Sequence, residues 1–241
     1  MTFTSFVLRL PALLLAIAIT VLMISCNPGV RGAGDLVTET RTETGFNALE
    51  INISGNVEVR TDSVFSIEVT CEENIIQYLE TDVDNGVLKI DFDRNVYGIN
   101  GLKIRVSAPS WKAFSVSGSA NVEVQDAISG DRLNLDVSGS GNIDVFDAIF
   151  DKTRITVSGS GNIEIDGSGT DLDCNVSGSG DIDALDFPVK TAEVTVSGSG
   201  SVRLDVSDLL DASVSGSGDI EYQGNPTVNA NVSGSGKIRK I

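Results

Sequence analysis

The pentapeptide Val137-Ser138-Gly139-Ser140-Gly141 decides the fold, because it recurs along the chain at a nearly constant interval. Further copies begin at Val157, Val176, Val196, Val214 and Val232, and a copy at Val116 ends in alanine. Successive copies are separated by 21, 20, 19, 20, 18 and 18 residues, and a weaker one begins at Ile53. Such a fixed interval indicates a repeat architecture in which each unit packs on its neighbours.

Alternating apolar residues stand on both sides of each pentapeptide. Leu133, Leu135 and Val137 lead into one copy, and Ile143 and Val145 follow it. This period of two is typical of half-buried β-strands, so the pentapeptide is a corner between two strands. Glycine allows either a positive φ or a close approach of two backbones there. The structural corner glycines are Gly118, Gly139, Gly141, Gly159, Gly161, Gly178, Gly180, Gly198, Gly200, Gly216, Gly218, Gly234 and Gly236.

Two topologies could use this pattern. In an antiparallel meander the corner would be a hairpin loop, whereas in a coil each unit would make one turn and like residues would stack. The constant interval favours the coil, since stacking buries an apolar face that a single unit leaves exposed. The sequence therefore predicts an all-β fold, a single-stranded parallel β-helix of about ten rungs over residues 45–241.

Residues 45–112 are less regular than the rest. Phe46–Arg60 and Ser66–Cys71 alternate like strands, and Glu72–Leu79 is expected to form a short helix. Asn85-Gly86 is a strong turn signal. Atypical units of this kind cover the exposed strand edges at the end of a stack.

The N-terminus is typical of an export signal. Arg9 precedes an uncharged, largely apolar stretch over 10–25, which is shorter than a membrane-spanning helix. Ser25-Cys26 resembles the cleavage and lipidation site of bacterial lipoproteins, so we expect residues 1–25 to be a lipoprotein signal peptide and Cys26 to be lipidated. Residues 26–44 are then expected to be a flexible tether to the outer membrane. The sequence leaves open whether the protein faces the periplasm or the cell surface.

The charge and composition exclude several classes of protein. Without the signal, 16 Lys and Arg stand against 34 Asp and Glu, a net charge of −18, which disfavours nucleic acid as a partner. The chain contains no histidine, so His-based catalytic triads are excluded. No cofactor is expected. Cys71 and Cys174 occupy the alternate, apolar positions of two separate strands. This placement predicts two buried free thiols.

One column of charged residues is the candidate site for a cation. If the units stack, Glu123, Asp144, Glu164 and Asp183 lie above one another on the outer face. A row of carboxylates could hold Ca²⁺ weakly, although a solvated face is the favoured interpretation. Beside this column, Asn121, Asn142 and Asn162 are expected to form a structural ladder of side-chain amides.

Three stretches resemble a known family. Phe46–Val59, Leu79–Ile90 and the repeated Val-Ser-Gly-Ser-Gly-Asn-Ile are similar to the "putative auto-transporter adhesin, head GIN domain" family, whose members are common in Bacteroidetes and often carry a lipoprotein signal. The resemblance covers about residues 45–241 and implies a GIN-type β-helix domain. By the general crossover rule its winding is right-handed. The resemblance brings no catalytic residues.

Three functions are consistent with these features. The favoured one is a non-enzymatic cell-envelope lipoprotein that acts as an adhesin-like module and binds a glycan or a protein. The second is a structural envelope protein that self-assembles, in an oligomeric state that the sequence leaves open. The third is a polysaccharide-acting β-helix enzyme, which is disfavoured because the repeats have almost no insertions that could form a groove.

Overall fold

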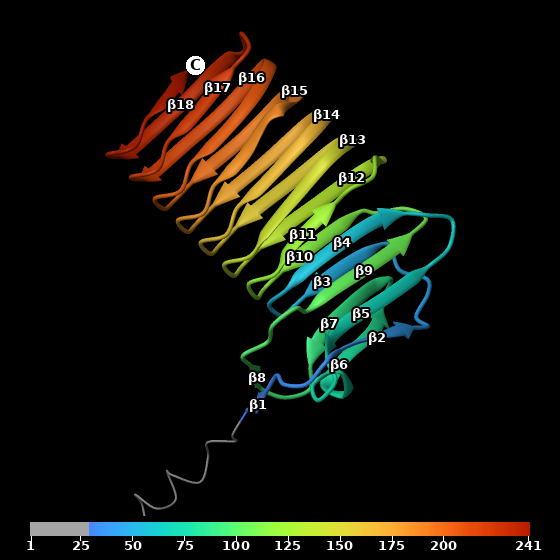
Figure 1. Cartoon of the computed structure of the whole chain (residues 1–241). Helices are drawn as coiled ribbons and strands as arrows, with labels where there is room; N and C mark the ends of the chain where they lie inside the picture. Colours follow the sequence, from blue (N-terminus) through green and yellow to red (C-terminus); the bar gives the residue numbers. More distant parts are fainter. Residues whose placement is uncertain (1–28) are drawn as a thin grey trace, which may run out of the picture.

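The repeats wind into a β-solenoid of about six turns over residues 113–240, seen as the stack of strands in Figure 1. The structure is a computed structural model that describes residues 29–241. Like positions pair in parallel register, with Val137 opposite Val157 and Val157 opposite Val176. The coil is therefore confirmed and the meander is excluded. The strands are β10 (Ala113–Val116), β11 (Asn121–Val124), β12 (Ile128–Val137), β13 (Asn142–Val157), β14 (Ile163–Val176), β15 (Ile182–Val196), β16 (Val202–Gly216), β17 (Ile220–Gln223), β18 (Thr227–Gly234) and β19 (Ile238–Lys240).

The pentapeptide corners form a row along one edge of the solenoid (Figure 1). The backbone N–H of Ser140 donates to the carbonyl of Gly118 at 3.0 Å, and Ser160 donates to Gly139 in the same way. A Cβ built on Gly161 would overlap the carbonyl oxygen of Gly141. Among the corner glycines only Gly216 and Gly234 have a positive φ, so close backbone approach is the main reason for glycine here.

Aliphatic side chains fill most of the inside of each turn, and two large rings are each matched by a glycine in the turn before. Phe150 and Phe187 are buried. A Cβ on Gly130 would lie 3.1 Å from the Phe150 ring, and one on Gly169 would lie 2.8 Å from the Phe187 ring. This alternation of small and large residues fills the core at the density that protein interiors require.

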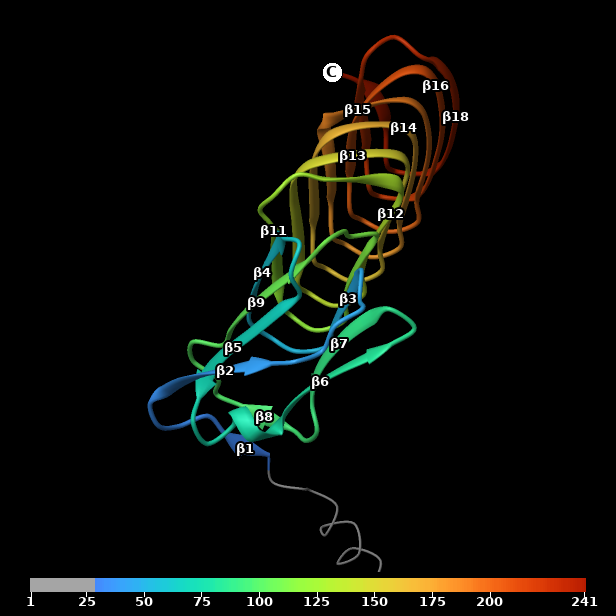
Figure 2. The same cartoon turned by 90° about the vertical axis from the view of Figure 1, so that its right-hand side faces the viewer.

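A nearly closed mixed sheet precedes the solenoid and covers its first turn (Figure 2). β3 pairs in parallel with β10, and β4 with β11, so the weak corner at Ile53 stacks as predicted. β7 and β9 extend these two columns by one more parallel strand each. The strands are β1 (Val30–Arg31), β2 (Leu36–Arg41), β3 (Ala48–Ile51), β4 (Asn56–Thr61), β5 (Ser66–Glu72), β6 (Leu79–Asp84), β7 (Val87–Phe92), β8 (Val96–Tyr97) and β9 (Lys103–Ala108).

The prediction of about ten rungs was wrong. β5 pairs antiparallel with β9 and with β2, and β6 pairs antiparallel with β7. Antiparallel strands cannot continue a coil in which every strand runs in the same direction. The stack of similar turns therefore stops at this mixed sheet.

The predicted flexible tether over 26–44 also differs from the structure. Residues 36–41 form β2, which pairs with β5 along its whole length, and residues 30–31 form β1, which pairs with β8. The predicted signal peptide over 1–25 and the predicted lipidation site Cys26 lie outside the described residues.

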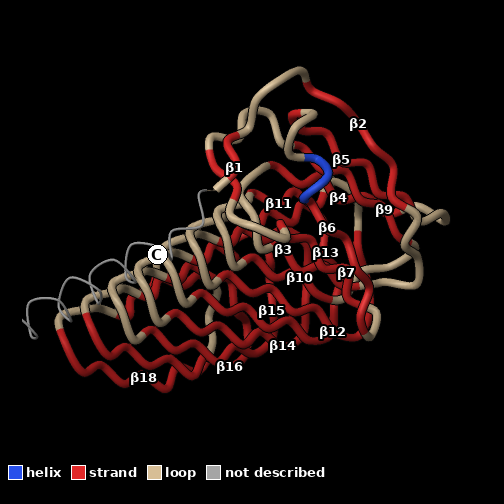
Figure 3. Tube along the Cα trace, turned by 90° about the horizontal axis from the view of Figure 1, so that it is seen from below, coloured by secondary structure: helices blue, strands red, loops and turns tan. Residues whose placement is uncertain are grey.

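Two local predictions in the N-terminal part, a short helix and a tight turn, are confirmed. The expected short helix is a 3-10 helix, η1 (Ile76–Tyr78), the blue segment in Figure 3. Asn85 and Gly86 both have positive φ and join β6 to β7, as a two-residue hairpin turn requires. Within residues 29–241, no helix has the length and apolar character needed to cross a membrane.

Both described cysteines are buried and free, as predicted. Burial, together with the smaller effect of the neighbouring Glu72 carboxylate, raises the pKa of the Cys71 thiol to about 11. Burial also raises the pKa of Cys174.

We therefore expect neither thiol to react with a disulfide reagent in the folded protein at pH 8, because only the thiolate is nucleophilic. Both should react once the protein is unfolded in guanidinium. Ellman's reagent measures the rate, and peptide mass spectrometry assigns the modified residues. Rapid modification of Cys174 before unfolding would contradict the buried position.

Candidate functional site

The predicted acidic column exists. On the strands that leave the corners, Glu123 lies opposite Asp144, Asp144 opposite Glu164, and Glu164 opposite Asp183. Glu58 extends the column at one end and Arg203 at the other. The vertical alignment that the sequence predicted is therefore confirmed.

The two ends of this column are neutralised and its middle is not. Lys103 and Arg105 contact the carboxylate of Glu58 at 2.5 and 3.0 Å, and the hydrogen bond from Lys103 is the main reason that its pKa is lowered. Arg203 pairs with Asp183. Partial burial raises the pKa of Asp144, and the carboxylates of Glu164 and Glu123 raise it further. Residues 29–241 contain no grouping of three His, Cys, Asp or Glu that could hold a metal ion, so the column is not assigned as a cation site.

We expect Asp144→Asn to stabilise the protein at pH 7 by about 0.5–1 kcal/mol, because like charges directly opposite each other on neighbouring strands are destabilising. A raised pKa means that the ionised carboxylate is disfavoured in the folded state. The gain should therefore disappear as the pH falls through the pKa of Asp144, where the wild-type side chain becomes neutral. Guanidinium titrations at several pH values measure the difference, with Asp147→Asn at the exposed far edge as the control. A gain that persisted at low pH would contradict this origin.

The asparagine ladder beside the column is structural and longer than predicted. The side-chain oxygen of Asn142 accepts the backbone N–H of Asn162 at 2.9 Å, and Asn162 does the same for Asp181. Asp181 and Asp219 continue the pattern by accepting from Ser201 and Lys237. Each oxygen satisfies a backbone donor of the next turn, which explains the choice of Asn and Asp after the corner.

A groove lies on the strands that lead into the corners. Its volume is about 470 Å³ and it crosses five consecutive strands from β12 to β16. Because neighbouring strands lie about 4.8 Å apart, the groove is about 19 Å long. Its two walls are rows of outward-facing residues that lie two positions apart on each strand, so the walls are separated by about 7 Å. One wall consists of Arg132, Lys152, Asp171, Thr191 and Leu209, and the other of Asn134, Arg154, Asp173, Glu193 and Asp211.

The groove has a basic and an acidic half, which meet in two ion pairs. Lys152 lies 3.7 Å from Asp171, and Arg154 lies 2.9 Å from Asp173. Asp171 also accepts a hydrogen bond from the Thr191 hydroxyl at 2.7 Å. The basic side chains remain largely exposed, with Lys152 at 58% and Arg154 at 68%. The groove is therefore an open polar surface that can form many hydrogen bonds.

The sequence analysis did not identify this groove. Its charged residues belong to no motif, and they face outward between the core residues. The available signal was the register itself: aligning the repeats on the corner places Asn134, Arg154, Asp173, Glu193 and Asp211 in one column. The sequence analysis considered only the acidic column after the corner, and not the equivalent columns before it.

Residues 45–226 match the family described as "Putative auto-transporter adhesin, head GIN domain", which is more than half of the chain. The chain belongs to this family. The GIN domain thus includes strands β3 to β9 and most of the solenoid, and the groove lies within its bounds. The resemblance inferred from the corners is confirmed.

Solved structures share the fold of this GIN domain protein over 88% of its length. A putative adhesin from Bacteroides fragilis has a TM-score of 0.84 at 23% identity, over 100% of its own chain. A putative adhesin from Parabacteroides merdae gives 0.71 at 25% identity over 99%, and a putative lipid binding protein from Parabacteroides distasonis gives 0.74 at 24% over 99%. Among curated proteins, none matches the chain.

Proposed function

We propose that this GIN domain protein is a non-enzymatic, adhesin-like module of the cell envelope that binds an extended glycan in the groove between β12 and β16. The groove is the observation that carries the proposal. Its walls repeat at every turn and present hydrogen-bond donors and acceptors without an enclosed cavity. This arrangement suits a long polar ligand that crosses several turns.

The period of the walls favours a glycan over a peptide. A pyranose ring in an extended chain advances by about one strand spacing, which is about 4.8 Å in this solenoid. An extended peptide advances by about 3.3 Å per residue, so its consecutive side chains would not fall on consecutive turns. Successive sugars can therefore make equivalent contacts on successive turns.

One relative with the same fold is described as a putative lipid binding protein. In this chain the interior is occupied by its own side chains, and the groove walls carry seven charged residues. Acyl chains require an apolar surface, because burial of charged groups against hydrocarbon is strongly unfavourable. These features support a glycan as the ligand.

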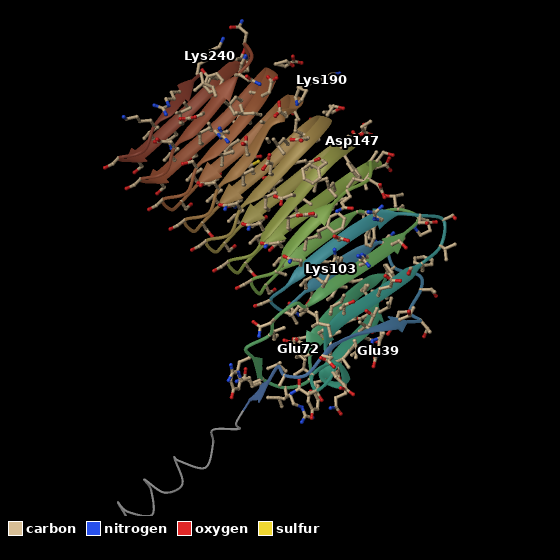
Figure 4. The ribbon with its side chains drawn as sticks, viewed as in Figure 1. Glu39, Glu72, Lys103, Asp147, Lys190 and Lys240 are labelled. Atoms are coloured by element: carbon tan, nitrogen blue, oxygen red, sulfur yellow. The ribbon has the colours of Figure 1, made fainter. Side chains whose placement is uncertain are left out.

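A glycan array probed with the purified protein tests the proposal. Asp173→Ala and Asp211→Ala together should abolish the signal of each bound glycan, since they remove two acceptors from one wall. Asp147→Ala is the matched control, because Asp147 is exposed at the edge opposite the corners (Figure 4). Binding that survives the double substitution would refute the groove as the site.

We also propose that Cys26 is acylated after removal of residues 1–25 and that the protein is held in this way at the outer membrane. The family resemblance and the lipobox-like Ser25-Cys26 support this. Radiolabelled palmitate should label the wild type and not Cys26→Ala. Protease treatment of intact cells then distinguishes the surface from the periplasmic face, and a cleavable protein would place it on the surface.

A further inference from the structure

The charges of the groove are segregated along the solenoid axis. Arg132, Lys152 and Arg154 lie on β12 and β13, whereas Asp171, Asp173, Glu193 and Asp211 lie on β14, β15 and β16. All seven face the same groove. The potential along it therefore changes sign once, between β13 and β14.

This segregation places like charges directly opposite each other on neighbouring strands. Arg132 pairs in register with Lys152, Asp173 with Glu193, and Glu193 with Asp211. Such neighbours are destabilising, and an alternating order would avoid the repulsion. The acidic column after the corners does alternate at one end, where Arg203 lies between Asp183 and Glu221.

The basic half retains free hydrogen-bonding capacity. Among residues 29–241, no carboxylate lies within ion-pair distance of Arg132. Arg154 contacts only one oxygen of Asp173, through Nε and one terminal nitrogen, so its other terminal nitrogen is available. Two guanidinium groups and the Lys152 ammonium thus line the part of the groove over β12 and β13. Planar guanidinium groups are well suited to bind a carboxylate or a sulfate.

The acidic half has the opposite character. Asp173, Glu193 and Asp211 offer acceptor oxygens on three successive strands, and ionised carboxylates accept hydrogen bonds without donating any. Sugar hydroxyl and amine groups are donors that match them. An anionic sugar at this end would be repelled.

We propose that the groove binds a linear glycan in one direction, with a single anionic terminal sugar at Arg132, Lys152 and Arg154 and neutral or amino sugars over the acidic strands. This inference rests on the proposed function, since it names the ligand class of the same groove. A chain of five sugars spans the five strands. A uniformly anionic glycan is rejected by the acidic half.

The test uses the full chain and a matched pair of oligosaccharides. One is a neutral tetrasaccharide capped by a terminal sialic acid, and the other is the same tetrasaccharide without the cap. By isothermal titration calorimetry the capped form should bind about tenfold more tightly at low salt, as expected for a charge-assisted contact. The ratio should fall as the salt concentration rises. An oligogalacturonate of five residues should bind more weakly than either.

Variants locate the acidic sugar. Arg132→Gln and Arg154→Gln should each reduce the ratio of the affinities for the capped and the uncapped form. Lys190→Gln is the control, since Lys190 is exposed at the edge opposite the corners (Figure 4) and should change neither value.

The outcomes separate the two proposals. Equal binding of the two oligosaccharides, unaffected by Arg132→Gln, would overturn the inferred direction and leave the groove as a glycan site. Binding of neither oligosaccharide, or binding of an extended peptide alone, would overturn both.

Discussion

Gly161→Ala is expected to prevent folding of the solenoid or to lower its free energy of unfolding by about 3 kcal/mol or more, as severe overpacking does. The added Cβ would overlap the carbonyl oxygen of Gly141 and lie 2.9 Å from a methyl carbon of Val137. A carbonyl in a stacked corner cannot move away like the end of a flexible side chain, because Gly141 is itself packed against Ala120 in the corner before. The corners would have to separate.

The measurement is guanidinium denaturation followed by circular dichroism. Ser160→Ala is the matched control: Ser160 is the preceding residue of the same corner, its side chain is exposed, and its substitution should change stability by less than about 0.5 kcal/mol. Equal stability of the two variants would show that the corners are not held by close backbone approach.

Phe187→Ala is expected to lower the free energy of unfolding by about 3–5 kcal/mol, the usual effect of deleting a buried ring. Phe187 is fully buried and occupies the space beside Gly169 in the previous turn. Because Gly169 has no side chain, it cannot fill the cavity left by the ring.

Phe146→Ala provides the control, since the same substitution at a residue that is 52% exposed should have a small effect. A second test adds Gly169→Ala to Phe187→Ala. The new methyl group enters the vacated space, so the double variant should be more stable than Phe187→Ala alone, whereas Gly169→Ala by itself should destabilise. Additive effects of the two substitutions would contradict direct packing of the ring on Gly169.

The solenoid could be predicted from the sequence because its contacts repeat at the interval of the sequence itself. Once Val137, Val157 and Val176 are placed in one column, strand alternation makes Asp144 and Glu164 face outward and Cys174 face inward. The choice between positive φ and close approach at the corner glycines could not be made, because it depends on the distance between two turns.

The N-terminal part could not be predicted in the same way. Its strands pair antiparallel across long separations, as β2 does with β5, and no interval in the sequence records those partners. Residues 36–41 also lack apolar alternation: every second side chain is partly covered, but these are Val37, Glu39 and Arg41. A strand with two charged residues on its inner side resembles a linker when read alone.

The candidate groove required the structure for a related reason. Outward residues carry no hydrophobic signal, and the meaning of Arg132, Lys152 and Arg154 depends on their shared position over neighbouring strands. The family resemblance predicts the fold but not the residues on the outer surface, because the residues that fill the core are not those that face a ligand.

The side-chain ladder after the corners has a consequence for how such a molecule can vary in size. Each Asn or Asp satisfies a donor in the following turn, and each corner contacts the corners directly before and after it. The segment 157–175 is therefore one whole repeat, and duplicating it would lengthen the array without creating a new kind of junction. Gain or loss of whole units can thus change the length of the solenoid without changing its fold.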